Sequence, residues 1–189
     1  MELLIPSEDY KKFRMNKGEL FRNKKLDKML SWETPTGRNM FSIQVIDERI
    51  RVAARFLHDK KDIVVVCSPL ECDAAKEFGK AVNAKVIETY RSSLFSNPKN
   101  ANYTEPEIIL VTNADENRNV IVEASLNNIP VLAFCNTNSR TDGIDLIVPI
   151  NITNKQAIEI ALWLIANEIR RLRGGEAIPM EVFSKGEEG

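Results

Sequence analysis

Short apolar runs recur along this chain at nearly constant intervals. The runs that start near residues 40, 63, 85, 108 and 130 begin 22 or 23 residues apart. Runs of Val and Ile without polar alternation suit strands that are buried on both faces. The intervals leave room for one crossover between successive strands, which predicts a parallel sheet with helices on its faces. The expected strands are Met40 to Val45, Ile63 to Cys67, Lys85 to Ile87, Ile108 to Val111, Val131 to Phe134 and Leu146 to Val148.

Helical periodicity fills three of the intervals between these runs and also follows the last run. We expect helices over 47–58, capped by Asp47, and over 72–82, 117–127 and about 158–172. Arg170, Arg171 and Arg173 follow the apolar stripe of the last helix, where cations suit the carboxyl end of the helix dipole.

Two connections show no helical pattern. Residues 135–145 are rich in Asn, Thr, Ser, Asp and Gly, and residues 88–105 are rich in Ser, Asn and Pro. A compact domain rarely keeps an 18-residue connection without a helix unless that connection has a use. The longer connection is therefore a candidate docking loop for protein neighbours or RNA, with Tyr90, Arg91, Phe95, Asn97 and Tyr103 as the expected contacts.

The net charge hides a strong asymmetry. The 189 residues, enough for one domain with tails, carry 26 basic and 27 acidic side chains, a net charge of −1. The window 11–28 alone carries +6, which leaves −7 for the remainder. Such a window is typical of a surface that binds nucleic-acid phosphates; a solvated amphipathic helical hairpin and a membrane-surface helix are the alternatives. The expected RNA contacts are Lys11, Lys12, Arg14, Lys17, Arg22, Lys24, Lys25 and Lys28.

The sequence contains no recognisable catalytic motif. The eight glycines form neither a dinucleotide-binding nor a P-loop motif, and one His and three Cys without CxxC spacing argue against a metal site. Four aspartates lie near strand ends, Asp47 and Asp115 after a strand and Asp62 and Asp145 before one, so they would occupy opposite edges of a parallel sheet. We expect no catalytic residue, cofactor or metal.

One window is more specific. It runs from Pro106 through Ile109-Leu110-Val111, Asn113, Asn117, Ile121 and Glu123 to Asn128-Ile129-Pro130. This spacing resembles the strand–turn–helix–strand signature of the small-subunit ribosomal protein two family, the SA or laminin-receptor-like family, in its archaeal and eukaryotic type. Further matching stretches are Asp47 to Arg55, Cys135 to Ser139, Ile144 to Asn151, and the closing-helix residues Trp163, Ala166, Glu168, Arg171, Arg173 and Gly174.

The resemblance implies a fold and a role. It implies an α/β, flavodoxin-like three-layer sandwich with a parallel sheet of about five strands and some crossovers without a helix. With the basic window, we expect a helical N-terminal arm over 1–36, the α/β domain over 37–174 and a tail over 175–189. The family is non-enzymatic and cytoplasmic, and its partners are small-subunit rRNA and other small-subunit ribosomal proteins, with no membrane and no small-molecule substrate. The alternatives are a flavodoxin-like or receiver-like small-molecule-binding protein or enzyme, and an adhesion module.

The chain also departs from the family. The segment comparable to its His-x-Gly signature reads Gly18-Glu19-Leu20-Phe21-Arg22-Asn23-Lys24, and the polar turn after its second strand becomes Cys67-Ser68-Pro69-Leu70-Glu71-Cys72. The chain is therefore expected to be a shortened, divergent member whose RNA contacts do not transfer one by one.

Overall fold

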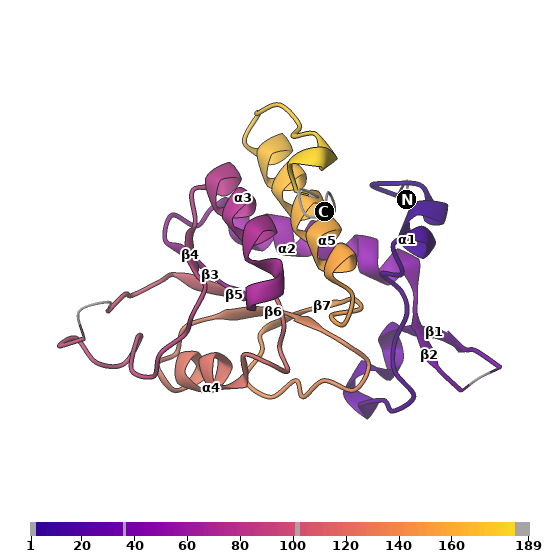
Figure 1. Cartoon of the computed structure of the whole chain (residues 1–189), viewed down its shortest axis with the longest axis horizontal. Helices are drawn as coiled ribbons and strands as arrows, with labels where there is room; N and C mark the ends of the chain where they lie inside the picture. Colours follow the sequence, from indigo (N-terminus) through magenta and orange to yellow (C-terminus); the bar gives the residue numbers. More distant parts are fainter. Residues whose placement is uncertain (1–2, 36, 101–102, 184–189) are drawn as a thin grey trace.

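A five-stranded parallel sheet forms the centre of the molecule (Figure 1). The computed structural model describes residues 3–35, 37–100 and 103–183. The strands are β3 (Ile63–Val66), β4 (Lys85–Ile87), β5 (Ile108–Val111), β6 (Val131–Cys135) and β7 (Leu146–Pro149). Their spatial order is β4-β3-β5-β6-β7, with every pairing parallel. This is the flavodoxin-like order, in which the chain reverses its direction of travel between β3 and β5. The prediction of a parallel sheet of about five strands is confirmed.

Helices cover both faces of the sheet and make three layers (Figure 1). On one face lie α2 (Ile43–His58), α3 (Cys72–Val82) and α5 (Lys155–Leu172). On the other lies α4 (Arg118–Leu126). Successive residues of β3 alternate between the two apolar clusters, Val65 on the α5 side and Val66 on the α4 side. A strand that is apolar at every position is therefore required, because both of its faces are buried.

The helix-free connection 88–105 completes the layer beside α4. Leu94 and Phe95 are buried in the same cluster as Val120 and Ile121 of α4. The loop thus buries apolar surface that a crossover helix would otherwise cover. The described residues of this connection, and those of 136–145, contain no helix, as predicted.

The run Met40 to Val45 does not join the parallel sheet. Its first residues form β2 (Asn39–Phe41), which pairs antiparallel with β1 (Leu30–Glu33), and α2 begins at Ile43. Asp47 therefore lies inside α2 and does not cap it. It is buried, and it accepts hydrogen bonds from the Tyr10 hydroxyl, the Leu4 N–H and Arg51. The expected strand and cap were wrong because an apolar helical stripe starts four residues earlier than the aspartate.

Both terminal segments pack against the domain. The N-terminal segment contains α1 (Ser7–Lys12), the 3₁₀ helix η1 (Lys24–Met29) and β1, so it is helical only in part. Its Tyr10, Met15 and Leu26 are fully buried. After α5, the Ile178 carbonyl accepts a hydrogen bond from the Trp163 indole, and the chain continues into a 3₁₀ turn, η3 (Met180–Val182). The division of the chain at residues 36 and 174 stays a prediction.

Candidate nucleic-acid interface

The N-terminal segment crosses the carboxyl ends of β6 and β7. Asn151, which follows β7, donates its backbone N–H to the Met15 carbonyl and its side-chain amide to the Arg14 carbonyl. Asn154, which caps α5, donates its side-chain amide to the Phe13 carbonyl. Two asparagines thus hold the backbone of three consecutive residues. This edge is where parallel α/β sheets position functional groups.

Thr137, in the connection after β6, holds the next part of the segment. Its hydroxyl accepts a hydrogen bond from the Glu19 N–H at 2.8 Å and donates one to the Phe21 carbonyl, and its carbonyl accepts the Asn23 N–H at 2.7 Å. Gly18 is necessary for this approach, because a Cβ there would lie 2.2 Å from Thr137 Cγ2. The basic window is therefore fixed by backbone hydrogen bonds.

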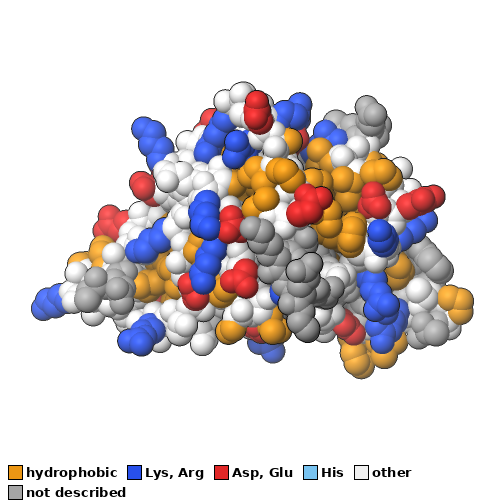
Figure 2. Space-filling view, turned by 45° about the horizontal axis from the view of Figure 1, so that its top comes forward, with side chains coloured by type: hydrophobic (Ala, Val, Ile, Leu, Met, Phe, Trp, Pro, Cys, Tyr) orange, Lys and Arg blue, Asp and Glu red, His pale blue; other side chains and the backbone are white. Residues whose placement is uncertain are grey.

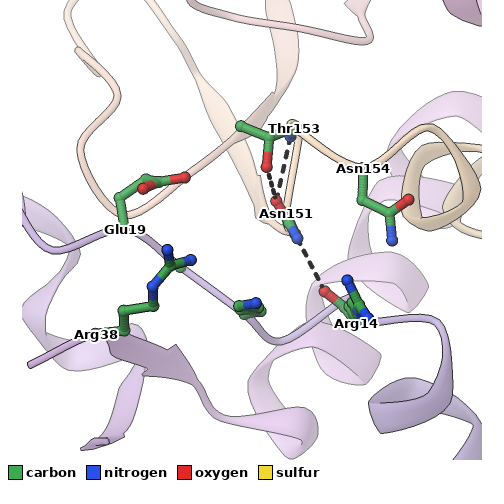
Figure 3. A pocket seen from close by; sticks show the side chains of 8 residues that line it. Arg14, Glu19, Arg38, Asn151, Thr153 and Asn154 are labelled. Carbon is green, nitrogen blue, oxygen red and sulfur yellow. Dashed lines mark hydrogen bonds between the residues drawn. The ribbon is translucent and has the colours of Figure 1, made fainter. Parts of the chain in front are cut away.

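A basic hollow lies between the N-terminal segment and the residues after β7 (Figure 3). It has a volume of about 230 Å³, and its lining includes Arg14, Lys17 and Arg38. No ion pair joins these three cations to a residue in the part of the chain that the structure describes. Glu19 is the one carboxylate in the lining. Three cations against one carboxylate favour an anion, and arginines suit phosphate oxygens because their N–H groups form a fork.

The other predicted contacts are dispersed. Lys11, Lys12, Arg22, Lys24, Lys25 and Lys28 are exposed, outside the hollow. Lys25 Nζ lies 2.6 Å from Asp142 Oδ1 and lowers the pKa of that carboxyl, and Arg22 lies 3.6 Å from Asp27. Lys12 lies over the Phe13 ring. Figure 2 shows Lys and Arg side chains in several groups with acidic side chains between them. The structure thus brings Arg14 and Lys17 together with Arg38, which lies outside the charge window and was missed.

Glu123 of α4 organises the candidate docking loop. Its carboxylate accepts hydrogen bonds from the Tyr90 hydroxyl, the Ser96 hydroxyl, and the backbone N–H groups of Ser93, Phe95 and Ser96. Burial acts to raise the pKa of Glu123, but the hydrogen bonds outweigh it and lower that pKa.

The expected loop contacts differ in their exposure. Tyr90 stacks on Phe95, but Phe95 is buried and supports the loop from inside, so it is not a surface contact. Arg91 and Asn97 are exposed, and Tyr103 is half-buried with its hydroxyl on Glu105. The role of Glu123 in holding the loop was not predicted, because nothing in the sequence spacing connects this residue with residues 90–96.

The crevice between β3 and β5 is filled by the protein's own polar side chains. Glu71 is buried, caps the turn at Ser68 and accepts the Thr112 hydroxyl at 2.8 Å. Burial raises the pKa of Glu71. In ligand-binding relatives of this topology an anion lies at the helix start beside this point. The buried Glu71 side chain occupies that position, which argues against the nucleotide-binding alternative.

Metal ligands and membrane-spanning helices are considered for the described residues alone. No group of three or more His, Cys, Asp or Glu in them is arranged to hold a metal ion. None of their helices is both long and apolar enough to cross a membrane.

The fold and the sequence together define the class of protein to which this chain belongs. The topology is that of a flavodoxin-like α/β domain whose carboxyl edge is covered by a basic N-terminal segment. A sequence profile of the family described as ribosomal protein S2 matches residues 57–171, more than half of the chain. The chain belongs to the ribosomal protein S2 family, which confirms the resemblance.

Archaeal proteins similar to this chain agree with this family assignment. The chain is 30% identical to small ribosomal subunit protein uS2 of Saccharolobus solfataricus, over 97% of this chain and 84% of the relative. It is 31% identical to the uS2 protein of Haloquadratum walsbyi, over 94% of this chain and 65% of that protein. For the uS2 protein of Thermofilum pendens the identity is 30%, with 92% and 83% covered.

Proposed function

We propose that this protein is a structural component of the small ribosomal subunit in the cytoplasm. It binds small-subunit rRNA through its basic N-terminal segment and contacts neighbouring ribosomal proteins through other surfaces. Family membership supports the role, and the names of the uS2 relatives place those proteins in the small subunit. The role is non-enzymatic: the protein positions RNA and carries out no reaction.

The convergence of Arg14, Lys17 and Arg38 in one hollow carries the RNA part of this proposal. A phosphate in the hollow would meet these three cations. The hydrogen bonds from Asn151 and Asn154 to the backbone hold Arg14 in place before RNA arrives. Little backbone entropy is then lost on binding, so more of the electrostatic attraction contributes to the affinity.

The test removes the three cations together. The variant R14Q/K17Q/R38Q is compared with K61Q/K85Q/K99Q, which removes the same charge from exposed positions outside the segment. Binding to small-subunit rRNA is measured from low to high salt, and co-sedimentation with small subunits is measured in parallel. We expect the first variant to flatten the salt dependence by about 0.7 to 0.9 logarithmic units for each phosphate that the protein no longer neutralises. An equal effect of both variants would refute the hollow as the site.

The loop 88–105 is the proposed contact with protein neighbours. Arg91 and Asn97 are exposed on a loop that Glu123 fixes. Other surfaces outside the basic window, where the net charge is −7, suit basic partners. Replacing Arg91 and Asn97 with Ala should reduce crosslinks to ribosomal proteins within isolated subunits, whereas the control K61A/N119A should not. Unchanged crosslinks in R91A/N97A would argue against a docking loop.

A further inference from the structure

Two large apolar side chains are exposed side by side within the basic segment. Phe21 is 81% exposed and Leu20 is 56% exposed. Isolated apolar residues on a surface are common, but an adjacent pair that includes an aromatic ring leaves a large area unfavourably in water. Leu20 lies against the turn of the β1–β2 hairpin, since a Cβ at Gly37 would be 3.8 Å from its Cδ2. The neighbouring hairpin thus leaves most of the Phe21 ring uncovered.

The backbone beneath this pair is held on both sides. Before it, the Glu19 N–H is bound by Thr137, and the carbonyls of Glu19 and Leu20 accept the Asn39 side-chain amide at 2.9 and 3.2 Å. After it, the Phe21 carbonyl accepts the Thr137 hydroxyl and the Asn23 N–H donates to the Thr137 carbonyl. Fixed backbone with free side chains is the arrangement of a preorganised binding element, because little entropy is lost when a partner arrives.

The charge around the pair indicates the kind of partner. Arg22 follows Phe21 directly, and Lys24 is exposed without an ion pair to any residue that the structure describes. Basic side chains beside an apolar pocket on a protein would favour an acidic rim on that protein. Basic side chains beside an exposed aromatic ring suit single-stranded nucleic acid, whose bases stack on the ring while its phosphates meet the cations.

We propose that Phe21 is a stacking platform for an unpaired RNA base. Leu20 packs beside the stacked nucleotide, and Arg22 and Lys24 contact the phosphates that flank it. This inference rests on the proposed RNA-binding function and adds to it a preference: the segment recognises a base displayed in a loop or single strand, in addition to the charge of a duplex. The phosphate hollow and the Phe21 platform belong to one segment but act on different parts of the nucleotide.

The test compares two RNA probes of equal length, a single-stranded 12-mer and a 12-base-pair duplex, with the full chain and its Phe21 variants. F21A should weaken binding to the single strand at least about fivefold, the lower end of what base stacking contributes. Its binding to the duplex should stay unchanged, because paired bases offer no exposed face in the strand. L126A serves as a control, since Leu126 is 78% exposed and lies on α4, outside the basic segment.

Two more variants separate stacking from simple apolar contact. F21W should keep or exceed the wild-type affinity, and its fluorescence should fall on binding by more than that of the wild type, which has two Trp residues. F21L should lose affinity as F21A does, because leucine has no flat aromatic face. If F21L binds as well as the wild type, the pair instead docks into an apolar pocket and the stacking proposal is wrong.

The proposed function and this inference fail differently. A wild-type chain that binds neither probe overturns both. A wild-type chain that binds with steep salt dependence, while F21A equals it on the single strand, overturns the platform and leaves the electrostatic site intact. Because Phe21 is exposed, its replacement leaves the fold unchanged, and the thermal unfolding midpoint of each variant checks this directly.

Discussion

Removing the Glu123 carboxylate should release the loop 88–105 from α4. Five hydrogen bonds end on its two oxygens: three on Oε1, from Phe95 N–H at 2.8 Å, Ser96 N–H at 3.0 Å and the Ser96 hydroxyl at 2.9 Å, and two on Oε2. A net contribution of about 1 kcal/mol per bond would give about 5 kcal/mol. Glu123 is partly exposed and the freed donors can reach water, so we expect about 3 kcal/mol for E123A.

The assay has a global and a local readout. Urea unfolding gives the change in unfolding free energy, and limited trypsin digestion reports the loop, because Arg91 and Lys99 are cleavage sites within it. E123A should unfold at lower urea and should be cut faster at both sites. E116A is the matched control, since Glu116 is exposed at the start of the same α4 region and its carboxylate accepts no hydrogen bond from a described residue.

The pH dependence gives an independent check. The pKa of Glu123 is lowered in the folded protein, so its stabilisation is fully present above the ordinary value of 4.5. It is lost as the pH falls below 4.5 through the lowered folded-state pKa. E123Q has one carbonyl oxygen and places an amide against the remaining donors, so it should be destabilised at neutral pH. The stability difference between wild type and E123Q should shrink as the medium is acidified.

One result would refute this reasoning. If E123A unfolds within about 0.5 kcal/mol of the wild type and the loop is cut no faster, the carboxylate does not hold the loop. Leu94 and Phe95 would then anchor it through burial alone.

Three further changes test contacts elsewhere in the fold. G18A should lower the unfolding free energy by about 2 kcal/mol, because the new Cβ would lie 2.2 Å from Thr137 Cγ2; an unchanged urea midpoint would contradict the close approach. D47A removes an acceptor of three hydrogen bonds, including those from Tyr10 and Arg51. Thermal unfolding should show a loss of about 3 kcal/mol in unfolding free energy for D47A and a smaller loss for D47N. Equal stability of both variants and the wild type would contradict this role of Asp47. R173A breaks hydrogen bonds to the carbonyls that end α2 and α3. It should lower the unfolding free energy by about 1 kcal/mol, because the Arg173 side chain is exposed. Amide hydrogen exchange at those two helix ends should become faster, and exchange at the wild-type rate would show that the contact is unimportant.

The sheet was predictable because strands that are buried on both faces have a recognisable local sequence, a run of apolar residues. Val64 and Val66 face one apolar cluster and Val65 faces the other, so the strand cannot alternate between polar and apolar residues. Helix α3 was predicted at its observed bounds, 72–82, because its apolar stripe and its ends are local too. The run at 40–45 misled because three strand residues pass directly into a helix, and a short apolar run fits both structures.

The candidate site was less predictable because it depends on distant residues. Arg14 and Lys17 stand out by charge, but Arg38 joins them only through the β1–β2 hairpin. Asn151 belongs to a stretch that resembles the family, but its hydrogen bonds join it to Arg14 and Met15, which lie 137 and 136 positions earlier in the chain. Periodicity and charge windows report neighbours along the chain, so they carry no sign of such contacts.

The anchoring of the N-terminal segment also sets an order of events during synthesis. The hydrogen bonds that fix residues 13–23 come from Thr137, Ser139, Asn151 and Asn154, up to 141 positions later. The basic segment is synthesised before these residues, yet it takes its final conformation only after the turn beyond β7 has been made. Contacts of such long sequence separation are slow to form, because the intervening chain must first bring its ends together. A nascent or truncated chain therefore presents the same charges without their arrangement, so the basic hollow becomes a property of the finished fold.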